Sequence, residues 1–187
     1  MVREILTVGH STHPIERFLT LLGGAGVESI ADVRRFPGSR RHPQFGADAL
    51  EESLREEGIA YESFREELGG RRSKKDVAAA GGDPPPDNSA WRNDSFRNYA
   101  DYLSTAAFGA GLERLEETAR KRRSAVMCAE AHPSRCHRRL IADVLLARGW
   151  RVLHLLPDGR LQEHSFTPEA VVEGDAVHYP GQPTLDV

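Results

Sequence analysis

The chain has 187 residues, of which 39% are hydrophobic and 28% are charged, and its formal net charge is -3. This length fits one compact domain, and the apolar fraction argues against global disorder. Two cysteines are too few for a disulfide-rich secreted scaffold, and no apolar run reaches the roughly 20 residues of a membrane-spanning helix. The first residues also lack the pattern of a signal peptide, so we expect a cytoplasmic protein without a membrane segment.

Short β-prone segments alternate with amphipathic segments along the chain. Strands are predicted at residues 2–8, 27–33, 59–64, 124–128 and 150–156. Helices are predicted at residues 14–22, 47–57, 96–103, 112–122 and from Ser134 to Gly149. This alternation predicts a single three-layer α/β/α domain over residues 1–187, with a mostly parallel sheet. Residues 65–94 are predicted to form a long polar loop within it, and residues 165–187 a weakly patterned tail.

Polar and ionisable residues follow the first, second and fourth predicted strands, where ligands bind in sheets of this class. Four arginines and no acid lie between Asp32 and Asp48, and three arginines, two histidines and no acid lie between Glu130 and Asp143. The amino end of a helix from Ser134 would also favour an anion. We therefore predict a site for phosphate or another anion, the alternative being arginines that pair with acids or are solvated. The ligand-binding candidates are Ser11, Asp32, Arg34, Ser39, Arg40, Arg41 and Arg138.

The candidates for catalysis are His10, Glu130, Cys136 and His137. Basic neighbours and a nearby helix start favour the thiolate of Cys136, which suits a nucleophile with His137 or His10 as proton carrier. The alternative is a buried cysteine that acts as a small apolar side chain, which we favour for Cys128. Glu130 and Asp32 suit acid–base chemistry, although Asp32 can instead orient Arg34 and Glu130 can cap the following helix.

Metal-ligand side chains also gather in this segment, where Cys128, His132, Cys136 and His137 lie within ten residues. Zinc sites usually draw ligand pairs from two separate segments, and adjacent Cys136 and His137 would point about 100° apart on a helix. We therefore assign no metal ligands and identify no cofactor. A disulfide between the two cysteines is disfavoured in a reducing compartment. Four aromatic residues near the long loop either stack on a ring of the ligand or pack in the core: Tyr61, Trp91, Phe96 and Tyr99.

Several short motifs occur along the chain in this order: Thr7-Val8-Gly9-His10-Ser11, Asp32-Val33-Arg34, Pro37-Gly38-Ser39 with Pro43-Gln44-Phe45, Leu68-Gly69-Gly70, Phe96-Arg97-Asn98-Tyr99-Ala100, and Cys128-Ala129-Glu130 with Cys136-His137-Arg138. With them, the chain resembles the family called domain of unknown function 488 from about Ile5 to His164. The resemblance implies a small α/β fold. It implies no established activity, although some members carry the label of a DNA repair protein.

The leading hypothesis is an enzyme that acts on an anionic, phosphate-bearing substrate, either a nucleotide or a nucleic acid. One alternative is a non-catalytic module that binds nucleic acid through its basic loops, which predicts salt-sensitive binding. A second alternative is a thiol or metal sensor built on the two cysteines. The sequence indicates no oligomeric state.

Overall fold

A six-stranded sheet forms the centre of the computed structural model, which describes residues 3–38 and 40–181. Its strands are β1 (Glu4–Gly9), β2 (Ser29–Asp32), β3 (Ala60–Ser63), β4 (Ser124–Cys128), β5 (Arg151–Leu155) and β6 (Leu161–Glu163). They lie in the order β3-β2-β4-β1-β5-β6, and all neighbours are parallel except β5 and β6. A separate hairpin joins β7 (Val171–Glu173) to β8 (Ala176–His178). The expectation of a mostly parallel sheet is confirmed.

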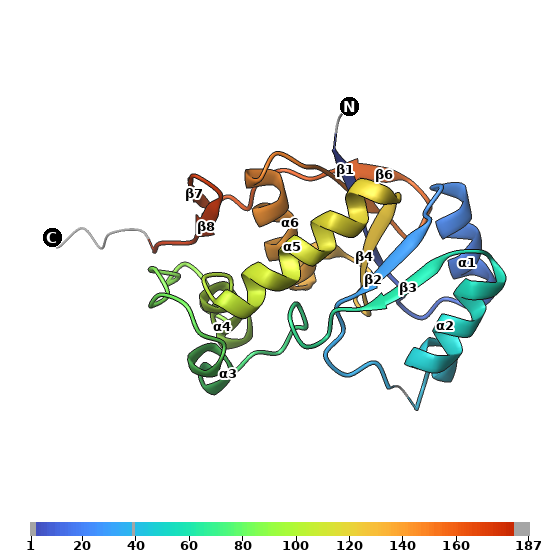
Figure 1. The fold of residues 1–187 in the computed structure, drawn as a ribbon, viewed down its shortest axis with the longest axis horizontal. Helices are drawn as coiled ribbons and strands as arrows, with labels where there is room; N and C mark the ends of the chain where they lie inside the picture. The colour runs from blue at the N-terminus through green and yellow to red at the C-terminus, as the bar shows by residue number, and fades with distance from the viewer. Residues whose placement is uncertain (1–2, 39, 182–187) are drawn as a thin grey trace, which may run out of the picture.

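Helices cover both faces of this sheet, as Figure 1 shows. They are α1 (Ile15–Gly24), α2 (Ala47–Glu56), α3 (Lys74–Ala79), α4 (Asp94–Tyr102), α5 (Ala106–Lys121) and α6 (Arg138–Ala147), with 3-10 turns η1 (Pro43–Phe45) and η2 (Pro133–Arg135). Side chains of β1 alternate between two cores: Leu6 packs with α1 and α2, whereas Ile5 packs with α4, α5 and α6. The three-layer α/β/α prediction is therefore confirmed. Within the described ranges, no helix is both long and apolar enough to cross a bilayer.

The carboxyl ends of β1, β2 and β4 meet at one edge. The register pairs Gly9 with Cys128 and Asp32 with Met127, so these strands end at nearly the same level. From β4 the chain continues into α6 on one face, whereas from β1 and β2 it continues into α1 and α2 on the other. A crevice opens where neighbouring strands feed opposite faces in this way, and this is where ligands bind in such folds.

Three segments differ from their predicted form. The helix expected from Ser134 begins only at Arg138, because η2 occupies Pro133–Arg135 and Cys136 has an extended backbone (φ -134°, ψ 144°). The stretch predicted as a polar loop contains α3, which starts with a capping box between Ser73 and Asp76. In the weakly patterned tail, Tyr179 is buried against the core that includes α6.

Candidate functional site

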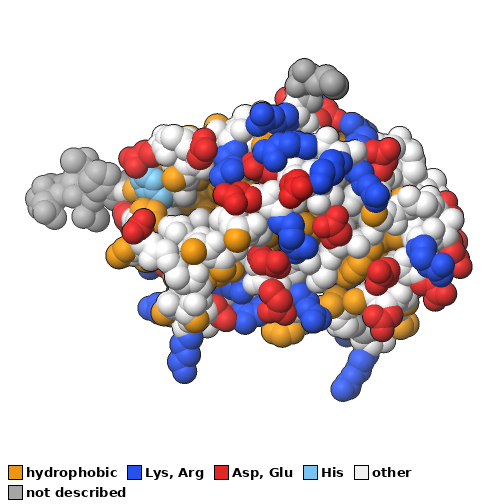
Figure 2. All heavy atoms as spheres, viewed as in Figure 1, with side chains coloured by type: hydrophobic (Ala, Val, Ile, Leu, Met, Phe, Trp, Pro, Cys, Tyr) orange, Lys and Arg blue, Asp and Glu red, His pale blue; other side chains and the backbone are white. Residues whose placement is uncertain are grey.

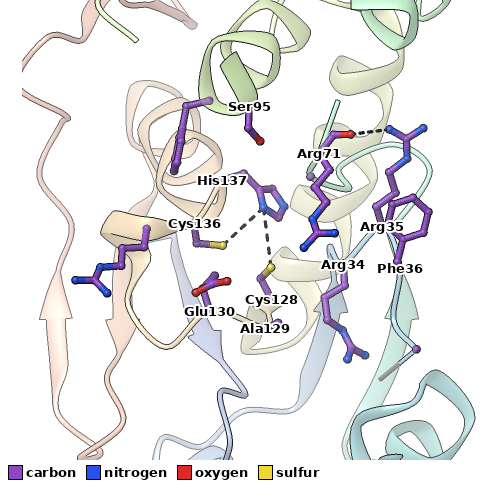
Figure 3. A pocket seen from close by; sticks show the side chains of 14 residues that line it. Arg34, Arg35, Phe36, Arg71, Ser95, Cys128, Ala129, Glu130, Cys136 and His137 are labelled. Carbon is purple, nitrogen blue, oxygen red and sulfur yellow. Dashed lines mark hydrogen bonds between the residues drawn. The ribbon is translucent and has the colours of Figure 1, made fainter. Parts of the chain in front are cut away.

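A pocket of about 340 Å³ lies beyond the carboxyl ends of β2 and β4 (Figure 3). We call it the site pocket. Its lining comes from the segments that follow β2 and β4, from the long loop and from the start of α4. The lining residues that matter most below are Arg34, Phe36, Gly70, Arg71, Cys128, Glu130, Cys136 and His137. It thus brings together three of the four predicted catalytic residues, all except His10.

Two cysteines and a histidine meet at the inner end of this pocket. The Nδ1 atom of His137 lies 3.6 Å from Cys136 Sγ and 4.0 Å from Cys128 Sγ, as the dashed lines in Figure 3 indicate. Cys128 is the last residue of β4, and His137 is the residue immediately before α6. Because Cys136 is extended rather than helical, its side chain and that of His137 converge instead of diverging. The geometric reason for assigning no metal ligands therefore does not hold for these three residues, whereas the exposed His132 lies outside their cluster.

Three contacts fix the ring of His137. Its Nε2 atom lies 3.2 Å from the carbonyl oxygen of Val33 and donates to it, so Nδ1 is the ring nitrogen that faces the sulfur atoms. Tyr99 packs against the ring with centroids 4.8 Å apart, and its hydroxyl donates to the Leu68 carbonyl oxygen. Gly70 passes so close that a Cβ atom there would lie 2.7 Å from Nδ1. The Leu68-Gly69-Gly70 motif therefore helps to hold the His137 ring in place.

The two thiols have opposite protonation tendencies. Burial raises the pKa of Cys136, but a hydrogen bond from the Cys128 thiol and the neighbouring His137 and Arg138 bring it well below the usual value. The pKa of Cys128 is raised well above the usual value by its hydrogen bond to Cys136 and by burial. Cys136 is thus the thiolate of the pair, as expected from its basic neighbours.

Arg138 lies behind the pocket rather than in its lining, although we expected it to bind the ligand. Its side chain is only 1% exposed. Nε donates to Cys136 Sγ at 3.4 Å, and the two terminal nitrogens donate to the Glu130 carbonyl oxygen at 2.6 Å and to Thr7 Oγ1 at 3.3 Å. Gly9 leaves room for the main chain of Glu130, since a Cβ atom at Gly9 would lie 1.8 Å from the Glu130 carbonyl oxygen. Arg138 therefore joins the ends of β1 and β4 and supports the Cys136 sulfur.

Arg34 lines the pocket, but other protein groups occupy most of its donors. Nε and one terminal nitrogen bind both carboxylate oxygens of Asp32 at 2.6 to 3.1 Å, and the other terminal nitrogen donates to the Phe45 carbonyl oxygen at 2.6 Å. The Tyr61 hydroxyl also donates to Asp32. Of the two roles considered for Asp32, the structure shows the orientation of Arg34.

His10 and Ser11 do not line the pocket. The ring of His10 stacks on Phe45 with centroids 4.1 Å apart, and its two nitrogens contact the Ser11 carbonyl oxygen and Arg34. Burial and the adjacent Arg34 lower the pKa of His10 to about 4, so the ring is uncharged at neutral pH. In the described structure His10 and Ser11 join strand ends: their backbone N–H groups donate to the carbonyl oxygens of Cys128 and Ala129.

Glu130 is exposed and lines the pocket together with Cys136 and Cys128 (Figure 3). In the described chain the carboxylate makes no hydrogen bond to the amino end of α6. Only the main-chain oxygen of Glu130 takes part in the strand-end contacts, through Arg138. The carboxylate therefore remains available for a ligand or a proton.

The basic residues Arg40 and Arg41, predicted as ligand-binding residues after β2, do not lie at the site pocket. Both are exposed, and Ser39 lies outside the described residues. Instead, Arg71 from the long loop points into the pocket (Figure 3) and has no hydrogen-bonded or ionic side-chain partner among residues 3–38 and 40–181. Arg35 holds this loop, because it donates to the Arg71 carbonyl oxygen and to both oxygens of Asp76.

Sequence reasoning did not select Arg71 as a site residue, and the only signal was the group of four basic residues in the segment Arg71-Arg72-Ser73-Lys74-Lys75. It also missed Phe36, which is 67% exposed and lines the pocket. Among the aromatic candidates, Phe96 lines the pocket and stacks on Trp91 with centroids 4.9 Å apart. The ring of Tyr99 packs against His137, and the hydroxyl of Tyr61 donates a hydrogen bond to Asp32.

A buried polar chain continues on the far side of Arg138, and we call it the histidine network. It runs from Thr7 Oγ1 to His154 at 2.7 Å, from His154 to His164 at 3.0 Å, and from His164 to Asp143 at 2.9 Å. Asp143 also accepts hydrogen bonds from Thr167 and Tyr179. The members of this network are Thr7, Asp143, His154, His164, Thr167 and Tyr179.

Comparison with known proteins identifies the family. The family described as Domain of unknown function DUF488 matches residues 14–145, a range that includes β2, β4 and every residue of the site pocket. No curated protein matches the chain, and no solved structure does. The match covers well over half of the 187 residues. The chain therefore belongs to the DUF488 family.

Proposed function

We propose that this chain is an enzyme that binds an anionic, phosphate-bearing substrate in the site pocket and converts it with the help of Cys136, His137 and Glu130. One observation carries the proposal: the guanidinium of Arg71, without a side-chain partner in the described structure, points into the same pocket as the Cys136–His137 pair. A guanidinium with free donors suits phosphate oxygens, and a thiolate beside an imidazole is a reactive group.

The size of the pocket favours a small substrate. Its volume of about 340 Å³ is at the lower end of the range for small-molecule sites. A mononucleotide or a sugar phosphate suits this volume better than a duplex does. Arg71 and the exposed Arg135 supply the positive charge for the phosphate, and Glu130 supplies a carboxylate for proton transfer.

A panel of mononucleotides and sugar phosphates tests the proposal with the full chain. Thermal shift reports binding, and mass spectrometry of the compounds reports conversion. We expect Arg71→Ala to weaken binding about tenfold or more, because it removes charged hydrogen bonds. Cys136→Ser should lose conversion but retain most of the binding. Arg55→Ala, on the exposed face of α2, is the matched control. If no compound in the panel binds, or if Arg71→Ala behaves like Arg55→Ala, the proposal fails.

A non-catalytic nucleic-acid-binding role is the second candidate, and the exposed ring of Phe36 favours it. Arg40 and Arg41 lie in the same loop, and neither has a hydrogen-bonded or ionic side-chain partner in the described chain. An exposed ring beside free cations is suited to stacking on an unpaired base. On the face in Figure 2, acidic and basic side chains are interspersed, so this face offers no basic surface for a duplex.

Fluorescence anisotropy with a labelled single-stranded oligonucleotide distinguishes the two candidates. The second candidate predicts affinity that decreases steeply with salt, decreases further in the Phe36→Ala and Arg40→Ala/Arg41→Ala variants, and is retained in Cys136→Ser. Affinity that is insensitive to salt and to these loop variants would count against it.

A further inference from the structure

The arrangement of Cys128, Cys136 and His137 matches that of metal ligands. The two Sγ atoms and a ring nitrogen of His137 all lie within 4.8 Å of one another. The two sulfurs face the same Nδ1 atom, at 3.6 and 4.0 Å. In a tetrahedral zinc site, with bonds of about 2.3 Å to sulfur and about 2.0 Å to nitrogen, ligand atoms lie about 3.5 to 3.8 Å apart. Small side-chain adjustments are therefore enough to place these three atoms around one ion.

The orientation of His137 is a second, independent observation. Histidines that bind metals usually donate their other N–H group to a carbonyl or carboxylate oxygen, which fixes the tautomer. His137 does this through Nε2, which donates to the Val33 carbonyl oxygen. Tyr99 and Gly70 hold the ring in the same orientation. In the neutral ring this tautomer leaves the lone pair of Nδ1, the nitrogen that faces the two sulfurs, free for an ion.

The surroundings of the three residues fit a site that is open on one side. Arg138 donates to Cys136 Sγ, and a hydrogen bond of this kind stabilises a thiolate that is bound to a metal ion. All three side chains line the site pocket, so a fourth coordination position would face that pocket rather than the protein interior. Three protein ligands with an open fourth position are typical of catalytic rather than structural zinc sites.

We propose that Cys128 Sγ, Cys136 Sγ and His137 Nδ1 bind one divalent metal ion, with Zn²⁺ as the best fit and a fourth position open to the site pocket. Two sulfurs and one imidazole favour Zn²⁺ over Mg²⁺, Ca²⁺ or Mn²⁺, which prefer oxygen ligands. A role for the ion in conversion rests on the proposed function, whereas its binding does not.

The full chain, purified without a metal-affinity tag, tests the site directly. We expect elemental analysis to find about one zinc ion per chain, the number that one tetrahedral cluster holds. After removal of the metal by a chelator, titration with Co²⁺ should produce a thiolate-to-cobalt charge-transfer band and the visible bands of tetrahedral cobalt. Cys128→Ser and Cys136→Ser should each weaken the charge-transfer band, and the double variant should abolish it.

His132→Gln is the matched control, because His132 belongs to the same segment but lies outside the cluster. It should bind metal like the wild type, whereas His137→Gln should bind at least tenfold more weakly. Alkylation of the wild-type protein is a test that needs no variant, so it does not depend on whether the variants fold. Both cysteines should react more slowly with the alkylating reagent when Zn²⁺ is present than when it is absent. Unprotected thiols, a Cys128–Cys136 disulfide in freshly reduced protein, or equal binding by His132→Gln and His137→Gln would overturn the proposal. Metal binding without conversion of any phosphate compound would contradict only the proposed function.

Discussion

The site pocket and the histidine network lie on opposite sides of Arg138 and contain similar residue types, yet their polar groups are in different states. In the network, both oxygens of Asp143 accept two hydrogen bonds each, and His154 and His164 use both ring nitrogens. In the pocket, the guanidinium of Arg71 has no side-chain partner in the described chain, and the carboxylate of Glu130 is exposed.

This difference indicates which polar groups contribute to stability and which are available for function. A buried polar group that is fully hydrogen-bonded adds rigidity, and its loss leaves its partners unsatisfied. A polar group that faces a cavity without a partner contributes little to stability and is available to a ligand. Substitutions in the network should therefore change the free energy of unfolding, and substitutions in the pocket should change binding.

The largest effect on stability is expected for Asp143→Ala. It leaves His164, Thr167 and Tyr179 without their shared acceptor in a buried environment. We expect a loss of about 3 to 5 kcal/mol in the free energy of unfolding, measured by urea denaturation. Asp175→Ala, at an exposed position, is the control. A loss no larger than that of the control would show that the network does not stabilise the fold.

The effect of lowering the pH by one unit is expected to be smaller. Burial and the neighbouring His164 lower the pKa of His154 to about 3, whereas a histidine in the unfolded chain titrates near 6.5. Between these values the unfolded chain binds a proton that the folded chain does not bind. The free energy of unfolding should therefore fall as pH is lowered from about 6.5, by up to about 1.4 kcal/mol per pH unit from His154.

Urea denaturation at several pH values measures this slope. His154→Gln should flatten it, because the variant lacks the group that takes up the proton on unfolding. His132→Gln, at an exposed position, should leave the slope as in the wild type. Equal slopes in the wild type and His154→Gln would mean that His154 does not stay neutral in the folded protein.

Gly70→Ala tests the close contact that holds the His137 ring in the pocket. The added methyl group would lie 2.7 Å from His137 Nδ1, so the ring must leave its present position beside the two sulfurs or the backbone must shift. We expect a loss of about 1 kcal/mol in stability, which is at the low end for overpacking because His137 is only half-buried. Substrate conversion should decrease much more than stability does. Gly24→Ala, at the end of α1 and outside the pocket lining, is the control, because an added Cβ there meets nothing within 4 Å.

The smallest effect on stability is expected for Arg71→Ala, within about 0.5 kcal/mol of the wild type, since an unpaired exposed side chain is removed. Its effect should appear in phosphate binding instead. Calorimetric titration with the best compound of the panel, together with urea denaturation, measures both quantities. A large loss of stability in this variant would contradict the difference between the two regions.

Much of the site segment was predictable because it depends on local order along the chain. Apolar segments that alternate with amphipathic ones predict the parallel sheet, and the rule on strand ends then selects the residues after β2 and β4. The rule selected Cys136, His137 and Glu130, which line the site pocket. The same rule selected His10 and Arg138, which the structure places outside the pocket lining. A position after a strand does not show whether a side chain faces the cavity or the neighbouring strand.

The α/β architecture and the edge of the sheet that carries the ionisable residues could be predicted from the amino-acid sequence, because periodicity and strand ends are local properties. The three-dimensional contacts were needed to show that Arg71 enters the pocket and that Cys128 and Cys136 face one nitrogen of His137. They were also needed to show that His164, Thr167 and Tyr179, all from the last part of the chain, donate hydrogen bonds to Asp143. These contacts join residues far apart in the chain or depend on one extended residue before a helix, and hydrophobic periodicity carries no information about either.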